Sequence, residues 1–440
     1  MKKEEKPGLD WLLDYRAAQP NFGLERMEKI LALRGNPHLK LSVIHLAGTN
    51  GKGSTIAYLR QLLKTSGLRV GTFTSPYLVS YNEQIAIDGL AISNQDLNVL
   101  LLTYQELFEQ DGDDPSLQGA TEFEIMTALA YDYFAQKKVD VALIEVGMGG
   151  LLDSTNVCQP ELTAITTIGL DHTALLGSTL AAIAEQKAGI IKENVPVVTG
   201  KLPAEALTVV ERIAQEKSAQ LLSYGQAYQS AWQASLPQGE RFCFSNETRK
   251  KELFETPLLG LHQVDNAALA LELCDQYCRL KKLSLLTKSQ VQEALSATTW
   301  AGRMERICPK PLIFLDGAHN PQAMETLLAT LKERYGDFHK QVLFTCIETK
   351  AVDEMLAQLR QLKGSQLTLT SFSDARAISR QKMQQLAEKE SLPYKDWQAF
   401  LEEYLGQEQP KAEVLVITGS LYFLAQVRHF LLTKLEDKQE

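Results

Sequence analysis

A glycine-rich turn directly after an apolar strand is the feature that most constrains how this chain folds. The segment 44–54, IHLAGTNGKGS, runs from a strand into a turn that carries one lysine, Lys52, and ends on Ser54. Glycines let backbone N–H groups converge on anionic oxygens, and an amphipathic run after the turn predicts a helix that points its positive end at the same place. Lys52 adds a point charge, and the Ser54 hydroxyl can face a magnesium ion. The turn is shorter than the usual phosphate-loop motif, and a plain tight turn is the alternative, but we predict phosphate binding.

The composition limits the kinds of partner. The chain has 440 residues, 45% of them hydrophobic, which is enough for two or three domains. With 45 basic and 54 acidic side chains the net charge is −9, so we expect no nucleic-acid surface and small-molecule substrates instead. We also expect a monomer.

The location of the protein is predicted from its ends, its apolar runs and its cysteines. The first residues, MKKEEKP, lack the apolar core of a signal peptide, and no apolar run is long enough to cross a bilayer. The six cysteines are scattered, which indicates reduced thiols rather than a metal site. These features predict a cytoplasmic protein that contacts no membrane.

The first part of the chain alternates between strands and helices. Continuous apolar strands are predicted near residues 41–47, 69–74, 139–146, 162–168 and 195–199, with helices over 53–67, from 121, and over 179–192. Thr121 and Glu124 form a capping box at the start of the second helix. This alternation predicts a mostly parallel sheet covered on both faces, with ligands beyond the carboxyl ends of the strands.

The second part predicts a smaller domain. Residues 201–260 are polar and interrupted by prolines, so we expect short antiparallel strands there, followed by helices over 266–278 and 288–297. The alternation then restarts, with strands at 312–315, 341–346, 366–370 and 414–418 and helices at 322–334, 351–363 and 378–389. We therefore divide the chain into domains 1–298 and 299–440 and expect the tail after Leu435 to be frayed.

Polar side chains follow several of the predicted strands. Glu145 ends one apolar strand, and His172 and Ser75 follow two others. A carboxylate, a hydroxyl and substrate phosphates are sufficient ligands for Mg²⁺, which keeps several of its waters. Each residue alone also fits an ordinary strand-end turn, and a histidine is a softer ligand than magnesium prefers.

Together these motifs resemble the folylpolyglutamate synthase and dihydrofolate synthase family of the ATP-dependent Mur ligase superfamily. The resemblance rests on AGTNGKGS at 47–54, TSP at 74–76, EVGMGGLLDSTN at 145–156, GLDH at 169–172, EQKAGIIK at 185–192, His262-Gln263 with Asn266-Ala267, Gly302-Arg303, and LDGAHNP at 315–321. The chain departs from the family where many members have histidine for Tyr77, arginine for Gln84, proline for Ala301 and Asp-Lys for Thr349-Lys350. These departures concern folate contacts more than phosphate chemistry.

The resemblance implies a fold, a reaction and site residues. It implies an α/β protein with a P-loop-like ATPase domain and a smaller Rossmann-like C-terminal glutamate-ligase domain. It implies that ATP converts a folate γ-carboxyl into an acyl phosphate, which the amine of L-glutamate attacks to give ADP and phosphate. The implied ATP contacts are Thr49, Asn50, Gly51, Lys52, Gly53, Ser54, Asn266, Arg303 and Asp316, and the implied metal ligands are Ser54, Ser75, Glu145, His172 and Lys187.

Three residues receive catalytic roles by the same resemblance: Lys187, His172 and His319. In similar enzymes the matching lysine is carbamylated and lies near a second metal ion. A lysine among apolar residues can lose its charge and react with carbon dioxide, although an ordinary helix-surface lysine is the alternative. His319 follows a strand of the second domain and is expected in the site without an assigned role.

Several functions remain open from the sequence. Glutamate addition to dihydropteroate, by a bifunctional enzyme or a dihydrofolate synthase, is the main alternative. A cell-wall Mur ligase would need a further N-terminal domain, and only about forty residues precede the phosphate loop. A nucleotide-dependent switch that makes no ligase product is the remote alternative.

Overall fold

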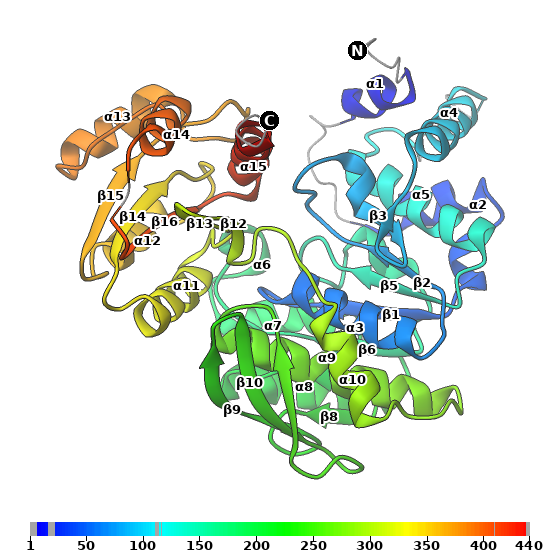
Figure 1. Ribbon diagram of the computed structural model, residues 1–440. Coiled ribbons are helices and arrows are strands. Elements are labelled where there is room, and N and C mark those ends of the chain that lie inside the picture. Colours follow the sequence, from blue (N-terminus) through cyan, green and yellow to red (C-terminus); the bar gives the residue numbers. More distant parts are fainter. Residues whose placement is uncertain (1–6, 16–22, 111–113, 116, 409, 437–440) are drawn as a thin grey trace. The chain divides into compact units, whose positions relative to one another are not determined.

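The computed structural model describes residues 7–15, 23–110, 114–115, 117–408 and 410–436 (Figure 1). They form two compact units, which we describe separately. Unit 1 comprises Met1–Ala231, Cys243–Phe254 and Asp265–Thr298, and unit 2 comprises Trp232–Phe242, Glu255–Val264 and Thr299–Glu440. The predicted frayed tail falls mostly outside the described residues, as does most of the N-terminal heptapeptide. No helix in the described ranges is long and apolar enough to cross a membrane.

Unit 1 is built on a sheet in the order β4-β3-β2-β5-β1-β6-β7-β8. Its strands are β1 Val43–Ala47, β2 Val70–Phe73, β3 Ile85–Ile87, β4 Leu90–Ala91, β5 Val141–Glu145, β6 Leu162–Ile165, β7 Val197–Thr199 and β8 Leu221–Ser223. In this spatial order, β2, β5, β1, β6, β7 and β8 pair in parallel with their neighbours, whereas β3 pairs antiparallel with β2 and with β4. Every residue of β1 and β5 is buried, which is why these segments are apolar apart from His45 and Glu145 and do not alternate. The predicted α/β fold with a mostly parallel sheet is confirmed.

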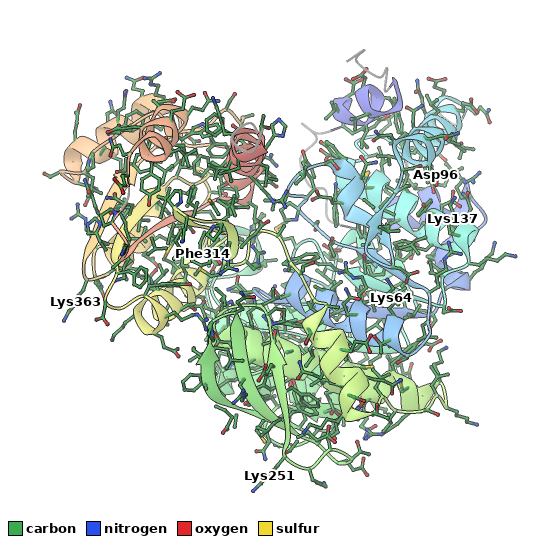
Figure 2. All side chains as sticks on the ribbon, viewed as in Figure 1. Lys64, Asp96, Lys137, Lys251, Phe314 and Lys363 are labelled. Carbon is green, nitrogen blue, oxygen red and sulfur yellow. The ribbon has the colours of Figure 1, made fainter. Side chains whose placement is uncertain are left out.

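The helices predicted for unit 1 are present with shifted ends, but further helices at residues 7–14, 25–32, 94–110, 173–176 and 204–216 were not predicted. The helices of the unit are α1 Pro7–Asp14, α2 Glu25–Ala32, α3 Lys52–Thr65, α4 Asn94–Gln110, α5 Glu122–Lys137, α6 Thr173–Leu176, α7 Leu180–Ala188, α8 Ala204–Glu216, α9 Leu261–Leu280, whose first turn is assigned to unit 2, and α10 Lys288–Ser296, with short 3-10 turns η1 Pro37–Lys40, η2 Tyr81–Gln84 and η3 Ser154–Val157. The predicted capping box of α5 is present, with Thr121 accepting a hydrogen bond from the Glu124 N–H and Glu124 accepting one from the Thr121 N–H. At the other end of α5, Lys137 pairs with Asp96 of α4 at 3.0 Å, and Figure 2 labels both side chains.

The prediction for residues 201–260 was wrong in part. A helix, α8, and the parallel strand β8 occupy its first third, where only short antiparallel strands were expected. Pro203 immediately precedes α8, a position where proline's fixed φ favours a helix rather than interrupting one. The rest forms a three-stranded sheet in the order β11-β10-β9, from β9 Gln229–Leu236, β10 Gly239–Ser245 and β11 Glu252–Thr256. The short connection between β9 and β10 requires an antiparallel hairpin.

Unit 2 has a five-stranded sheet in the order β12-β13-β16-β14-β15. Its elements are β12 Glu305–Pro309, β13 Leu312–Asp316, α11 Pro321–Arg334, β14 His339–Phe344, α12 Val352–Leu359, β15 Ser365–Leu369, α13 Arg380–Lys389, α14 Trp397–Gly406, β16 Glu413–Thr418 and α15 Leu421–Glu436. All strand pairs except β12–β13 are parallel. The predicted second, smaller α/β domain is confirmed, while β12, α14 and α15 were not predicted.

Candidate functional site

The phosphate-loop segment lies where β1 ends and α3 begins, as predicted. Gly51 is the N-cap residue of α3 and has φ +87°, a left-handed conformation that favours glycine. A side chain on Gly51 would collide with the Asn266 side-chain oxygen, so this glycine allows Asn266 of α9 to lie against the loop. The fold thus brings Asn266 to the loop from more than 200 residues away in the sequence.

The loop is held from the side by the segment that follows β6. The Thr49 and Asn50 N–H groups donate to the carbonyl and the hydroxyl of Thr167 at 2.8 and 3.0 Å. The Thr49 hydroxyl exchanges hydrogen bonds with the backbone of Gly169 at 3.0 and 3.1 Å. These contacts hold the backbone at the start of the loop against the segment that follows β6.

Glu145 lies beside the lysine of the loop. Glu145 ends β5, pairs in register with Leu46 of β1, and is buried. Its carboxylate accepts a hydrogen bond from the Ser75 N–H at 3.2 Å and lies 3.8 Å from Lys52 Nζ, which also donates to the Gly48 carbonyl at 3.0 Å. Ser54, in the first turn of α3, is buried too. Three of the predicted site segments therefore meet at the carboxyl edge of the sheet.

Lys187 lies in the last turn of α7 and is only 5% exposed. Burial, and after it the positive charge of Lys52, lower the pKa of its ammonium to about 7, although Asp171 and Asp153 oppose the shift. A substantial fraction of this side chain is consequently a neutral amine near neutral pH. The electrostatic influence of Lys52 and Asp171 places Lys187 in the same region as the phosphate loop and the 169–172 turn.

His172 is more exposed than the other predicted ligands. Its side chain is 42% accessible, and its ring lies 3.9 Å from Asp171. His172 also has φ +50° as the N-cap residue of α6. No group of three or more His, Cys, Asp or Glu side chains within the described ranges is arranged to hold a metal ion. Any magnesium at Glu145 would therefore take much of its coordination from hydroxyls, water and substrate.

The predicted site residues of unit 2 lie around the carboxyl end of β13. The buried Asp316 carboxylate accepts hydrogen bonds from the N–H groups of Met304 and Ala318, each at 2.9 Å. Burial raises the pKa of Asp316, and the nearby Arg303 opposes that shift. His319 Nδ1 lies 2.7 Å from the Gly317 carbonyl oxygen. The β12–β13 hairpin thus brings Arg303 back beside Asp316.

Four residues near these groups received no individual role from the sequence. His262 is held neutral by burial and by Arg303, which lower its pKa to about 4. His45, Asp153 and Thr155 form a buried hydrogen-bonded chain beneath the sheet edge. A histidine inside an otherwise apolar strand was the available signal for His45, and the carboxylate after the 147–150 glycine turn was the signal for Asp153.

Comparison with known proteins places this geometry in a family. Residues 46–274 match the Mur ligase middle domain, and residues 302–421 match the Mur ligase, glutamate ligase domain. A dihydrofolate synthase/folylpolyglutamate synthase of Bacillus subtilis is 37% identical, with 92% of this chain and 94% of the relative covered. A folylpolyglutamate synthase of Lacticaseibacillus casei is 35% identical, with the same 92% and 94% covered. A solved FPGS–AMPPCP–folate complex superposes with a TM-score of 0.83 at 32% identity, over 97% of this chain and 99% of that one.

Proposed function

Because the chain belongs to the Mur ligase family, among the folylpolyglutamate and dihydrofolate synthases, we propose that it is an ATP-dependent acid–amino-acid ligase. It joins L-glutamate to the γ-carboxyl of a (tetrahydro)folate polyglutamate through an acyl phosphate, and it releases ADP and phosphate. The observation that carries this proposal is the buried Glu145 carboxylate beside Lys52 in the glycine loop.

The residues assigned to ATP come from several segments of the chain. We assign Thr49 to Ser54 to the nucleotide: the N–H groups of Thr49 and Asn50 bond Thr167, so the backbone N–H groups for phosphate come from the start of α3, together with the lysine and a hydroxyl, and Asn266 lies against the same loop. Arg303 and Asp316 are assigned to the same nucleotide by the family resemblance. We accordingly propose that residues 1–298 are the ATP-binding domain and residues 299–440 the glutamate-ligase domain.

The residues around Glu145 fit a magnesium ion that arrives with substrate phosphates. One buried carboxylate and the hydroxyls of Ser54 and Ser75 are hard oxygen donors, the type that magnesium prefers. We assign Glu145, Ser54, Ser75 and His172 to this ion. When bound, it supplies positive charge that neutralises the phosphate oxygens during transfer.

Lys187 is proposed to be carbamylated and to serve as a ligand for a second metal ion. Carbamylation requires a neutral amine, and the low pKa of Lys187 supports this assignment. His172 is placed with these ligands, and His319 is assigned to the site of the acyl phosphate or the incoming glutamate.

The protein's own contribution to the reaction is charge handling rather than covalent catalysis. The transferred phosphoryl group has a loose transition state, so lysine, arginine and oriented N–H groups matter more than a nucleophilic side chain. Lys52 Nζ lies 3.8 Å from the Glu145 carboxylate, and its positive charge can stabilise the negative charge that develops on the transferred phosphate.

A second acceptor is supported by one comparison. The Bacillus subtilis relative is named for both dihydrofolate synthase and folylpolyglutamate synthase activities. We therefore keep glutamate addition to dihydropteroate as the alternative reaction of the same site. For both reactions the partners are small molecules, and we propose a cytoplasmic monomer that binds neither nucleic acid nor membrane.

An ADP-release assay tests the function. The protein is incubated with ATP, magnesium and glutamate, and dihydropteroate, tetrahydrofolate and methylenetetrahydrofolate are compared as acceptors. We expect ADP release that requires both glutamate and a folate acceptor, together with a product one glutamate heavier by mass spectrometry. ADP release that is independent of every acceptor would favour a nucleotide-dependent switch.

A further inference from the structure

A histidine lies in the middle of β1, a strand of unit 1 whose residues are all buried. His45 is the third residue of β1, three positions before the phosphate loop, and is fully buried. A polar side chain at such a position is unfavourable unless it makes specific hydrogen bonds. His45 therefore needs an explanation beyond packing.

The imidazole begins a chain of hydrogen bonds. His45 Nε2 lies 2.8 Å from Thr155 Oγ1, and the Thr155 hydroxyl donates to Asp153 Oδ1 at 2.5 Å. Because the Thr155 proton is used on the carboxylate, its oxygen accepts, and His45 must carry its proton on Nε2. Burial lowers the pKa of His45 to about 3, which agrees with a neutral ring.

The chain ends on the glycine turn that follows Glu145. Asp153 Oδ2 accepts a hydrogen bond from the Met148 N–H at 2.8 Å, and Oδ1 accepts another from the Thr155 N–H at 3.0 Å. These bonds satisfy a carboxylate that is almost completely buried. The turn at 147–150 is consequently tied through Asp153 to the strand that leads into the phosphate loop.

The other side of the same turn contacts the helix that carries Lys187. The Leu151 N–H donates to the Gln186 carbonyl at 2.7 Å. A side chain at Gly150 would approach that carbonyl to 2.6 Å and Lys187 Cα to 3.1 Å, so the turn lies directly on the helix backbone. Asn156 adds a hydrogen bond from its amide to the Gly189 carbonyl at 3.1 Å.

We infer that His45 and Thr155 are positioning residues: through Asp153 they hold the 147–150 turn and so fix the spacing between the Glu145 carboxylate and Lys187. The inference rests on the proposed function, because it concerns the same site. It assigns no contact with substrate to His45 or Thr155. It predicts instead that a change at either residue alters how the site holds magnesium.

The test removes one hydroxyl without changing side-chain shape. Thr155→Val deletes both hydroxyl bonds, and Thr155→Ser keeps them. Thr163→Val is the matched control, because Thr163 is a buried threonine whose hydroxyl donates to the Pro196 carbonyl at 3.2 Å, outside the His45–Thr155–Asp153 chain. For each variant we measure the melting temperature with AMPPCP at increasing magnesium concentration, and the magnesium midpoint is the concentration that gives half of the full stabilisation. We also measure kcat and KM for ATP. Thr155→Val should raise the magnesium midpoint and lower kcat by about 10- to 100-fold, with KM for ATP within about twofold, as expected for a residue behind a metal ligand.

The outcomes separate positioning from simple stability. Thr155→Ser should recover most of the magnesium response, and Thr163→Val should lose thermal stability without a change in the magnesium midpoint. Equal losses in Thr155→Ser and Thr155→Val, or no difference between Thr155→Val and Thr163→Val, would overturn the inference. If Thr155→Val does not fold, His45→Gln is compared with His45→Leu. The glutamine amide can still donate to Thr155, whereas leucine cannot. Equal magnesium midpoints in these two variants would overturn the inference.

The failure of the proposed function would look different. In that case the wild-type protein forms no glutamylated product with any acceptor. The magnesium dependence of AMPPCP stabilisation still tests the His45–Thr155–Asp153 chain, because it requires no turnover.

Discussion

At the scale of single residues, Lys187 shows how burial prepares a side chain for chemistry. Its ammonium is removed from water in α7 and lies within the electrostatic influence of Lys52, so the pKa falls from 10.5 to about 7. The two carboxylates that oppose this shift, Asp171 and Asp153, do not cancel it. Folding thus places this lysine where its charged form is unfavourable, and the proposed carbamylation requires the neutral amine.

The shift of Lys187 predicts a pH dependence of stability. Between pH 7 and pH 10.5 the unfolded chain holds a proton on Lys187 that the folded chain lacks, so the free energy of unfolding rises with pH across this window. From pH 7 to pH 9 the rise from this group is about 2 kcal/mol. Urea unfolding in carbon-dioxide-free buffer should show a smaller rise in Lys187→Met than in the wild type. Lys64→Met, on the exposed face of α3, should keep the wild-type rise, and equal slopes in all three proteins would contradict the assigned pKa.

Arg303 is the second residue with a specific expectation. Its Nη1 donates to the Gly302 carbonyl at 3.0 Å, and its charge acts on Asp316 and His262. Arg303→Ala should lower kcat by about 100-fold, the scale for loss of one transition-state charge contact, with little change in melting temperature. Arg306→Ala removes an exposed arginine of the adjacent strand β12 and should retain wild-type turnover. A near-normal ligase rate in Arg303→Ala would remove Arg303 from the mechanism.

At the scale of elements, a buried carboxylate joins the β9–β10 hairpin to α11 inside unit 2. Glu240 accepts hydrogen bonds from Trp232 Nε1, the Ser235 hydroxyl, the Gly260 N–H and Arg334 Nη1, at 2.8 to 3.0 Å. Arg334 also donates to the carbonyls of Gly239 and Leu236. Three separate segments, β9, the residue Gly260 and α11, therefore donate hydrogen bonds to one negative charge on β10.

Neutralising Glu240 should be strongly destabilising. Glu240→Gln leaves the buried Arg334 without its counter-charge, and breaking one side of a buried ion pair costs about 3 kcal/mol or more. The control is Glu255→Gln in the Arg241–Glu255 pair, whose side chains are 47% and 46% exposed, where we expect a loss below about 1 kcal/mol. Equilibrium unfolding in urea measures both, and similar losses in the two variants would show that the Glu240 cluster is not a structural centre.

At the scale of the whole molecule, the sequence predicted what repeats locally and missed what depends on distant contacts. The parallel strands, the capping box at Thr121 and the phosphate loop follow from periodicity and turn chemistry, and all are present. The helix after Pro203 was missed because prolines and a polar composition favoured short antiparallel strands there, whereas the apolar face of α8 joins the buried cluster that α7 and β7 form. The meeting of Asn266 with Gly51, and of His45 with Thr155 and Asp153, joins segments far apart in the sequence, and no local pattern predicts these pairs. Such pairs become visible only when the strand order is known.

The last prediction concerns where the chain can be divided. The proposed boundary between residues 298 and 299 coincides with one border of unit 2, but residues 232–242 and 255–264 also belong to that unit. A fragment 299–440 would lack Glu240 and expose Arg334 of α11. Residues 229–260 joined to 299–440 by a flexible linker would retain the cluster and omit α9 and α10, which belong mostly to unit 1. We expect the linked fragment to unfold cooperatively in urea, and 299–440 to unfold at lower urea and to bind the dye ANS, as loosely packed states do. Glu240→Gln in the longer fragment should reproduce part of this loss. Equal stability of the two fragments would mean that the hairpin is dispensable and that residue 299 is a true domain boundary.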